Sequence, residues 1–173
     1  MQHFKEEIKI NRRVLSVLVE NQSGVLSKIA GLFSRRGYNI DSLSVGETEN
    51  PKISRMTITI ADDDYIIEQI TKQLYKLIPV IKVIELKPDN AVYRELVLVK
   101  IKTTLETRAS LIETTNIFRG KIIDVSKDTM TVELTGDSNK ISAYIEMITP
   151  YGIVEFVRSG FAGLQRGNIK ITD

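Results

Sequence analysis

The order of apolar patterns repeats once along this 173-residue chain, and the repeat strongly restricts the possible folds. Each half is predicted to run strand, helix, strand, strand, helix, strand. In the first half the strands are 13–20, 38–46, 53–61 and 80–86, and the helices are 23–36 and 64–76. In the second half the strands are 96–102, 121–125, 129–134 and 153–158, and the helices are 105–118 and 141–148. This βαββαβ order predicts an α+β chain of two ferredoxin-like domains, each a four-stranded antiparallel sheet with two helices on one face.

Two periodicities support these assignments. Apolar residues of the first helix recur at Val25, Ile29 and Phe33, close to the 3.6-residue period of an α-helix. In the third strand Met56 and Ile58 alternate with polar residues, as in a sheet with one covered face. The turn-prone segment 87–90 is predicted to be a linker. The predicted domains are therefore 12–87 and 94–160, followed by a C-terminal tail at 161–173.

A candidate ligand site lies where the first strand turns into the first helix. The turn reads Asn21-Gln22-Ser23-Gly24. The first N–H groups of a helix are unpaired and carry partial positive charge, so a carboxylate can bind there. Gly24 lets the backbone approach the ligand, and Asn39 at the start of the next strand is expected to supply a polar amide. These features predict a receptor for a small amino acid.

The second half lacks these features. Its corresponding turn reads Thr103-Thr104-Leu105-Glu106, which has no glycine and carries an acidic residue in the predicted first helical turn. A carboxylate side chain at that point occupies the helix dipole and repels an anionic ligand. A ligand site is therefore expected in the first half only.

Composition excludes several other functions. The chain has no cysteine and His3 is its only histidine, which argues against thiolate zinc sites and Ser-His-Asp triads. A net charge of +2 without a basic block does not favour nucleic acid. The acidic residues Asp62, Asp63 and Asp64 are interpreted as a helix cap rather than a catalytic cluster, and no metal site is predicted. With no long apolar run or signal sequence, a cytoplasmic protein is expected.

Two other functional classes are considered: RNA-recognition domains share the element order, and other amino-acid-sensing proteins share the type of ligand. RNA-recognition domains present stacking aromatic residues on a central strand, whereas the predicted third strands here, 55–61 and 129–134, contain none. An amino-acid-sensing regulatory or transcriptional protein with another partner is the alternative to the function given below. No basic helix-turn-helix element is visible for a transcriptional role.

The chain resembles the small, regulatory subunit of acetohydroxyacid synthase, also called acetolactate synthase, which begins with an ACT domain. The resemblance extends over about 12–167, and the motif most specific to this family is the run Arg36-Gly37-Tyr38-Asn39-Ile40. The segments that carry it are 12–27, 32–40, 54–57, 69–77, 99–101, 117–125 and 158–160.

The resemblance implies a protein without a catalytic site or cofactor of its own. Such subunits bind a branched-chain amino acid, typically valine, with leucine and isoleucine as alternatives. They confer feedback inhibition on a catalytic large subunit, and activate it. That partner uses thiamine diphosphate, FAD and magnesium. The family's ACT domains form a homodimer with a continuous sheet, and the effector lies between the turn of one protomer and the strand start of the other.

Carried over to this chain, the family's effector site comprises a turn and a facing strand. The predicted residues are Asn21, Ser23, Gly24, Val25 and Leu26 in the turn, and Asn39 and Ile40 in the strand. Backbone amides are expected to bind the carboxylate, Asn21 or Asn39 the ammonium group, and apolar side chains the alkyl group. Purely structural roles remain open for two of these residues. Ser23 is then only a helix cap and turn residue, and Asn39 only completes a strand end.

Overall fold

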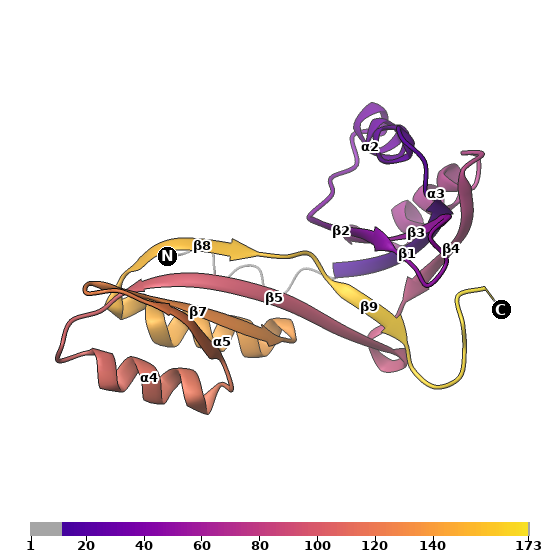
Figure 1. Cartoon of the computed structure of the whole chain (residues 1–173). Helices are drawn as coiled ribbons and strands as arrows, with labels where there is room; N and C mark the ends of the chain where they lie inside the picture. Colours follow the sequence, from indigo (N-terminus) through magenta and orange to yellow (C-terminus); the bar gives the residue numbers. More distant parts are fainter. Residues whose placement is uncertain (1–11, 173) are drawn as a thin grey trace. The chain divides into compact units, whose positions relative to one another are not determined.

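The computed structural model describes residues 12–172, which form two compact units (Figure 1). The first unit comprises the chain up to Val92 together with the segment from Gly160 onward, and the second unit is Tyr93–Ser159. The first unit contains β1 (Arg12–Glu20), α2 (Val25–Arg36), β2 (Ser42–Glu47), β3 (Ile53–Ala61), α3 (Asp64–Leu74), β4 (Val80–Leu86) and the 3₁₀ turn η2 (Pro88–Asn90). Strand β5 (Ala91–Lys102) begins in the first unit and continues into the second. The remaining elements are α4 (Arg108–Ile117), β6 (Lys121–Val125), β7 (Thr129–Gly136), α5 (Ser138–Ile148), the 3₁₀ turn η3 (Thr149–Tyr151), β8 (Ile153–Arg158) and β9 (Ala162–Gln165).

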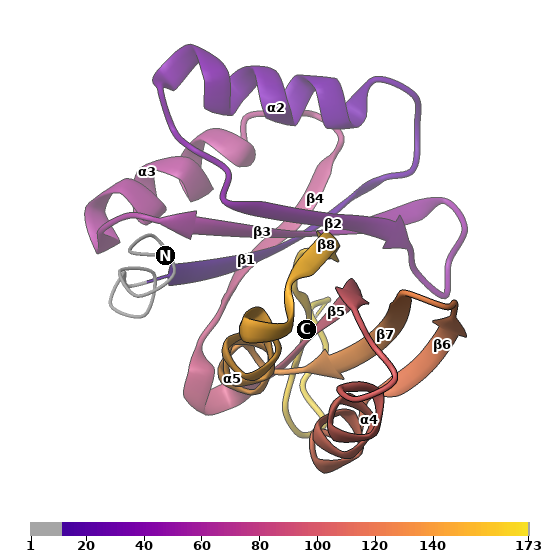
Figure 2. The same cartoon turned by 90° about the vertical axis from the view of Figure 1, so that its left-hand side faces the viewer.

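The sheet of the first unit has the strand order β2-β3-β1-β4, with antiparallel neighbours. Helices α2 and α3 cover one face of it (Figure 2). Leu15 and Val17 of β1 point into the core on that face, where they join Ile29 and Phe33 of α2 and Ile70 of α3. This is the ferredoxin-like arrangement that the repeat predicts.

The second unit repeats the topology, with the order β6-β7-β5-β8. Its core contains Val97 and Val99 of β5, Val132 of β7, and Ile141 and Tyr144 of α5. The predicted fold class is therefore confirmed in both halves of the chain.

Several element boundaries were predicted wrongly. The strand predicted at 38–46 begins only at Ser42, because Gly37 ends α2 in the left-handed conformation, with φ 70°, and the following residues cross to the sheet edge. Tyr38 packs edge-to-face on Phe33 during this crossing. The helix predicted from Leu105 begins at Arg108, and α2 begins at Val25 rather than at Ser23. The strand predicted from Leu96 begins at Ala91.

The C-terminal segment 160–172 belongs to the first unit. Its strand β9 pairs with β5, and the Arg166 backbone N–H donates to the Asn90 carbonyl at 2.8 Å. Phe161 and Ile171 are buried. Gly160 touches the backbone of Leu43 in β2, since a β-carbon added there would lie 2.8 Å from the Leu43 carbonyl carbon. The chain therefore folds back onto its first unit before it ends.

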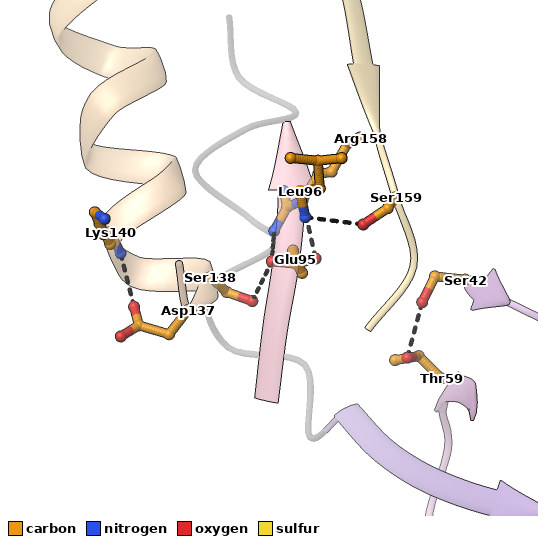
Figure 3. A network of polar contacts seen from close by, with 9 residues as sticks. All are labelled: Ser42, Thr59, Glu95, Leu96, Asp137, Ser138, Lys140, Arg158 and Ser159. Atoms are coloured by element: carbon orange, nitrogen blue, oxygen red, sulfur yellow. Dashed lines mark hydrogen bonds and ion pairs between the residues drawn. The ribbon is translucent and has the colours of Figure 1, made fainter. Parts of the chain in front are cut away.

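A buried ion pair lies inside the second unit, close to both points where the chain passes between units (Figure 3). Arg158 donates from Nε and Nη2 to the two oxygens of Glu95, at 3.0 and 2.8 Å. The Ser138 hydroxyl donates to Glu95 Oε2 at 2.9 Å. Beside the pair, Leu96 and Ser159 exchange two hydrogen bonds, both 2.9 Å long. Strands β5 and β8 are therefore joined firmly at this end of the sheet.

Candidate functional site

The turn before α2 presents unpaired backbone donors to solvent. Gly24 is the N-cap in the left-handed conformation, with φ 82°, and no side chain caps the helix. The Lys28 N–H donates to the Gly24 carbonyl at 3.0 Å, whereas the N–H groups of Gly24, Leu26 and Ser27 have no acceptor among residues 12–172. No acidic residue stands in the first helical turn. This end of α2 can therefore accept an anion.

The apolar residues of this turn have different surroundings. Leu26 is 44% exposed beside the unpaired donors, so its side chain can contact the alkyl part of a ligand. Val25 is only 4% exposed and belongs to the core, which means that it supports the turn from below instead of forming a wall of the site. The Ser23 side chain is exposed and does not cap α2, although Ser23 lies in the turn that leads into the helix.

Asn21 connects the turn to the hairpin between β2 and β3. Its Nδ2 donates to Glu47 Oε1 at 3.0 Å and to the Pro51 carbonyl at 2.9 Å. These contacts span 26 and 30 residues of sequence and could not be anticipated from local pattern. They leave the amide oxygen as an acceptor, with the Glu47 carboxylate nearby. A ligand ammonium group suits both oxygens.

Asn39 and Ile40 lie in the segment between α2 and β2, not in a strand as predicted. The Asn39 Nδ2 donates to Asp41 Oδ1 at 2.7 Å, which again leaves an exposed amide oxygen next to a carboxylate. Ile40 is half-buried and packs against the core.

The structure does not bring the two halves of the predicted site together within one chain. The turn precedes α2 and Asn39 follows it in the chain. Because α2 has 12 residues, its two ends are about 18 Å apart at ~1.5 Å per residue. One amino acid cannot span that distance, so the turn and Asn39 of one chain cannot contact the same ligand molecule.

The equivalent turn of the second unit is closed by its own side chains. Thr104 N–H donates to Thr107 Oγ1 at 2.9 Å, and Thr107 N–H donates to Thr104 Oγ1 at 3.2 Å. Glu106 therefore precedes α4 and does not occupy its first turn, which corrects the prediction. The distinction between the halves persists for a different reason, since the donors here are already partly satisfied.

The acidic residues before α3 have structural partners. Asp63 is the N-cap and accepts the Ile66 N–H at 2.9 Å, and Asp64 forms an ion pair with Arg13. Among residues 12–172, no group of three or more His, Asp or Glu side chains gathers in a way that suits a metal ion. Within the same residues, no helix is both long and apolar enough to span a membrane.

Comparison with known families matches each half of the chain separately. Residues 15–82 match the model of the AHAS small subunit-like ACT domain, and residues 94–167 match the model described as small subunit of acetolactate synthase. The chain belongs to the acetolactate synthase small-subunit family.

Relatives of this acetolactate synthase small subunit match along nearly their whole length. A probable acetolactate synthase small subunit from Methanothermobacter thermautotrophicus is 51% identical over 163 residues, which cover 94% of this chain and 97% of that protein. The acetolactate synthase small subunit of Mycobacterium leprae is 51% identical, covering 88% and 90% of the two chains. The crystal structure of the acetolactate synthase small subunit from Thermotoga maritima superposes with a TM-score of 0.86 at 42% identity, covering 92% of this chain and all of that one.

The candidate site lies within the segment that matches the ACT model. All seven predicted effector residues, from Asn21 to Ile40, fall within the matched segment 15–82. The second model ends at 167, within the returning segment of the first unit. The matched segment therefore contains β9 as well as most of the second sheet.

Proposed function

We propose that this chain binds a branched-chain amino acid, with valine as the first candidate, and thereby confers feedback inhibition on a catalytic subunit of acetolactate synthase. The observation that carries the proposal is the open N-terminus of α2. Its unpaired N–H groups suit the ligand carboxylate, and the exposed Leu26 side chain suits the alkyl group. Leucine and isoleucine offer the same three groups, so they are the alternative effectors.

The complete site requires two copies of the chain. Strand β2 is an edge of its sheet, and its residues Leu43 and Val45 bear apolar side chains. If two β2 edges pair antiparallel about their midpoint, Ser42 of one copy faces Glu47 of the other. Asn39 and Ile40 of one copy then approach the Asn21 turn of the other, because Asn21 itself bonds to Glu47. The six residues of β2 span about 20 Å at ~3.4 Å each, similar to the length of α2.

The ligand would then touch two protomers. The turn of one copy supplies N–H donors, Leu26 and the Asn21 amide oxygen, and the second copy supplies the Asn39 amide oxygen and the Ile40 side chain. Ser23 stands exposed at the rim, and Val25 fixes the turn from the core. Effector binding changes the equilibrium between two dimer arrangements only as far as its affinity for them differs.

The inhibited and activated partner is the catalytic large subunit. The proposal assigns all cofactors of the reaction to that subunit, namely thiamine diphosphate, FAD and magnesium. This chain contributes the effector site and the homodimer, with no nucleic acid or membrane involved in its role.

The substitution Gly24→Asp tests the site directly. It places a carboxylate at the N-terminal end of α2, where the ligand carboxylate is expected, and no atom of the described residues lies within 4 Å of an added β-carbon. Gly24→Asn is a matched control, because it has nearly the same size and the same unfavourable positive φ but no charge. Calorimetric titration with valine should show binding to the wild type and the Asn variant, and none to the Asp variant.

A functional measurement completes this test. With the catalytic subunit present, Gly24→Asp should remove inhibition by valine while activation of the partner persists. Full valine inhibition of the Asp variant would contradict the assignment of the carboxylate to this turn. Loss of inhibition in both variants would show that backbone strain is responsible, and the charge argument would fail.

A further inference from the structure

A cavity of about 520 Å³ lies in the first unit on the sheet face opposite α2 and α3. Leu18 of β1 and Arg55 of β3 are paired in register and alternate with residues of the helix-covered core, so both point to this side. The other walls are the hairpin 48–50 and the returning segment 164–172. A volume of this size is within the ~300–1,000 Å³ range of small-molecule sites.

Arg55 is a half-buried cation whose guanidinium group has few hydrogen-bond or ion-pair partners in the protein. Its side chain makes one hydrogen bond, from Nη1 to Ser16 Oγ at 3.4 Å, and none of the ion pairs among residues 12–172 includes it. Its neighbours in register, Leu18 and Gly46, have no side-chain acceptor. A guanidinium has five N–H donors, so most of them remain available to an anion.

The rest of the cavity combines apolar walls with one negative and one positive group. Leu18 and Ile53 from the sheet and Ile171 from the returning segment supply aliphatic surface, while Glu49 supplies a carboxylate and Lys170 an ammonium group. The cavity is formed only because 160–172 folds back onto the first unit. An aliphatic molecule with one carboxylate matches both the cation and the apolar surface.

We propose that this cavity is a second ligand site, separate from the α2 turn, for a small aliphatic carboxylate. The ligand carboxylate pairs with Arg55, and its alkyl group lies against Leu18, Ile53 and Ile171. Two sources offer this chemistry, an amino acid and the corresponding 2-oxo acid. Glu49 provides a partner for the ammonium group that only the amino acid carries.

The test uses the full chain with 13C-labelled isoleucine methyl groups, carrying Gly24→Asp to remove the first site. Valine and 3-methyl-2-oxobutanoate are titrated separately, and the methyl resonances of Ile53 and Ile171 are followed by NMR. Saturable shifts of both resonances are expected with at least one of the probes, and the probe that binds identifies the source. Absence of shifts with both probes would overturn the proposal.

Substitution of Arg55 makes the test specific. Arg55→Gln should weaken binding about tenfold or more, and Arg55→Lys, which keeps the charge but loses the planar fork, should weaken it less. Lys52→Gln is the matched control, because it removes an exposed cation of the same hairpin that does not line the cavity. Unchanged affinity in a folded Arg55→Gln variant would contradict the site. Ile53 pairs with Glu20 beside the Asn21 turn, whereas Ile171 belongs to the returning segment, so the Ile171 resonance distinguishes binding in the cavity from binding at the α2 turn.

Discussion

Removing the cation of the Glu95–Arg158 pair should destabilise the second unit far more than removing its anion. Glu95 is 4% exposed and Arg158 20%. In Arg158→Met the buried carboxylate keeps only its bond from Ser138, and an uncompensated buried charge costs ~3–5 kcal/mol. We expect about 3 kcal/mol, the lower end, because that bond remains. In Glu95→Gln the side-chain amide oxygen can still accept a hydrogen bond, and the Arg158 guanidinium can be solvated by water. The expected cost is therefore ~1–2 kcal/mol.

Urea denaturation combined with hydrogen exchange measures this difference. With a slope of ~1.5 kcal/mol per molar, a loss of 3 kcal/mol lowers the urea midpoint by about 2 M. Amide exchange in β5 and β7 assigns the loss to the second unit. Glu155→Gln is a control on the same two strands, because the Lys100–Glu155 pair is 3.3 Å long and exposed, and it should cost less than ~0.5 kcal/mol. Equal costs for Arg158→Met and Glu95→Gln would refute the reasoning.

Two further substitutions test the packing in each unit. Gly31→Ala in α2 should stabilise the chain by ~0.5–1 kcal/mol in thermal melts, because within residues 12–172 an added β-carbon meets only Arg35 Nη1, at 3.4 Å. Destabilisation would instead indicate that this surface of α2 packs closely against another molecule. Tyr144→Phe should cost ~1–2 kcal/mol near neutral pH, because it leaves the buried Thr115 hydroxyl without its 3.0 Å partner. Burial raises the pKa of Tyr144 above its ordinary value of 10.0, so the folded state favours the neutral phenol. This stabilisation is complete below pH 10 and decreases as the pH rises through the raised pKa. The wild type should therefore lose more stability than Tyr144→Phe between pH 9 and 11 in urea titrations, and parallel losses would contradict the pKa shift.

The fold was predictable because short-range patterns determine it. Met56, Ile58 and Ile60 alternate along β3, and Ile29 and Phe33 repeat at helical spacing, so strands and helices could be assigned from single segments. The predicted helix boundaries were wrong where side chains form hydrogen bonds with backbone N–H groups next to the helix. The side chains of Thr104 and Thr107 each accept a hydrogen bond from the other residue's backbone N–H, so α4 begins later than predicted. Leu105 therefore lies outside the helix and is 89% exposed.

The candidate site was predictable only in its local part. The open N-terminus of α2 follows from Gly24 and the lack of an acidic first turn, both visible in the sequence. The anchoring of Asn21 by Glu47 and Pro51, and the return of residues 160–172 to the first unit, depend on contacts between distant segments. Phe161 and Ile171, which are buried in the returning segment, are ten positions apart and form no periodic pattern.

If the effector lies between two protomers, a heterodimer of two differently defective chains should recover half of the binding sites. Gly24→Asp disables the turn and Asn39→Ala disables the facing segment, where the Asn39 side chain is exposed and, among residues 12–172, bonds only to Asp41. A heterodimer of these variants, isolated with two different affinity tags, has both defects in one site and none in the other. Valine calorimetry should therefore give half the wild-type number of sites, at wild-type affinity. A heterodimer with no restored binding would place the whole site in one chain and contradict the account.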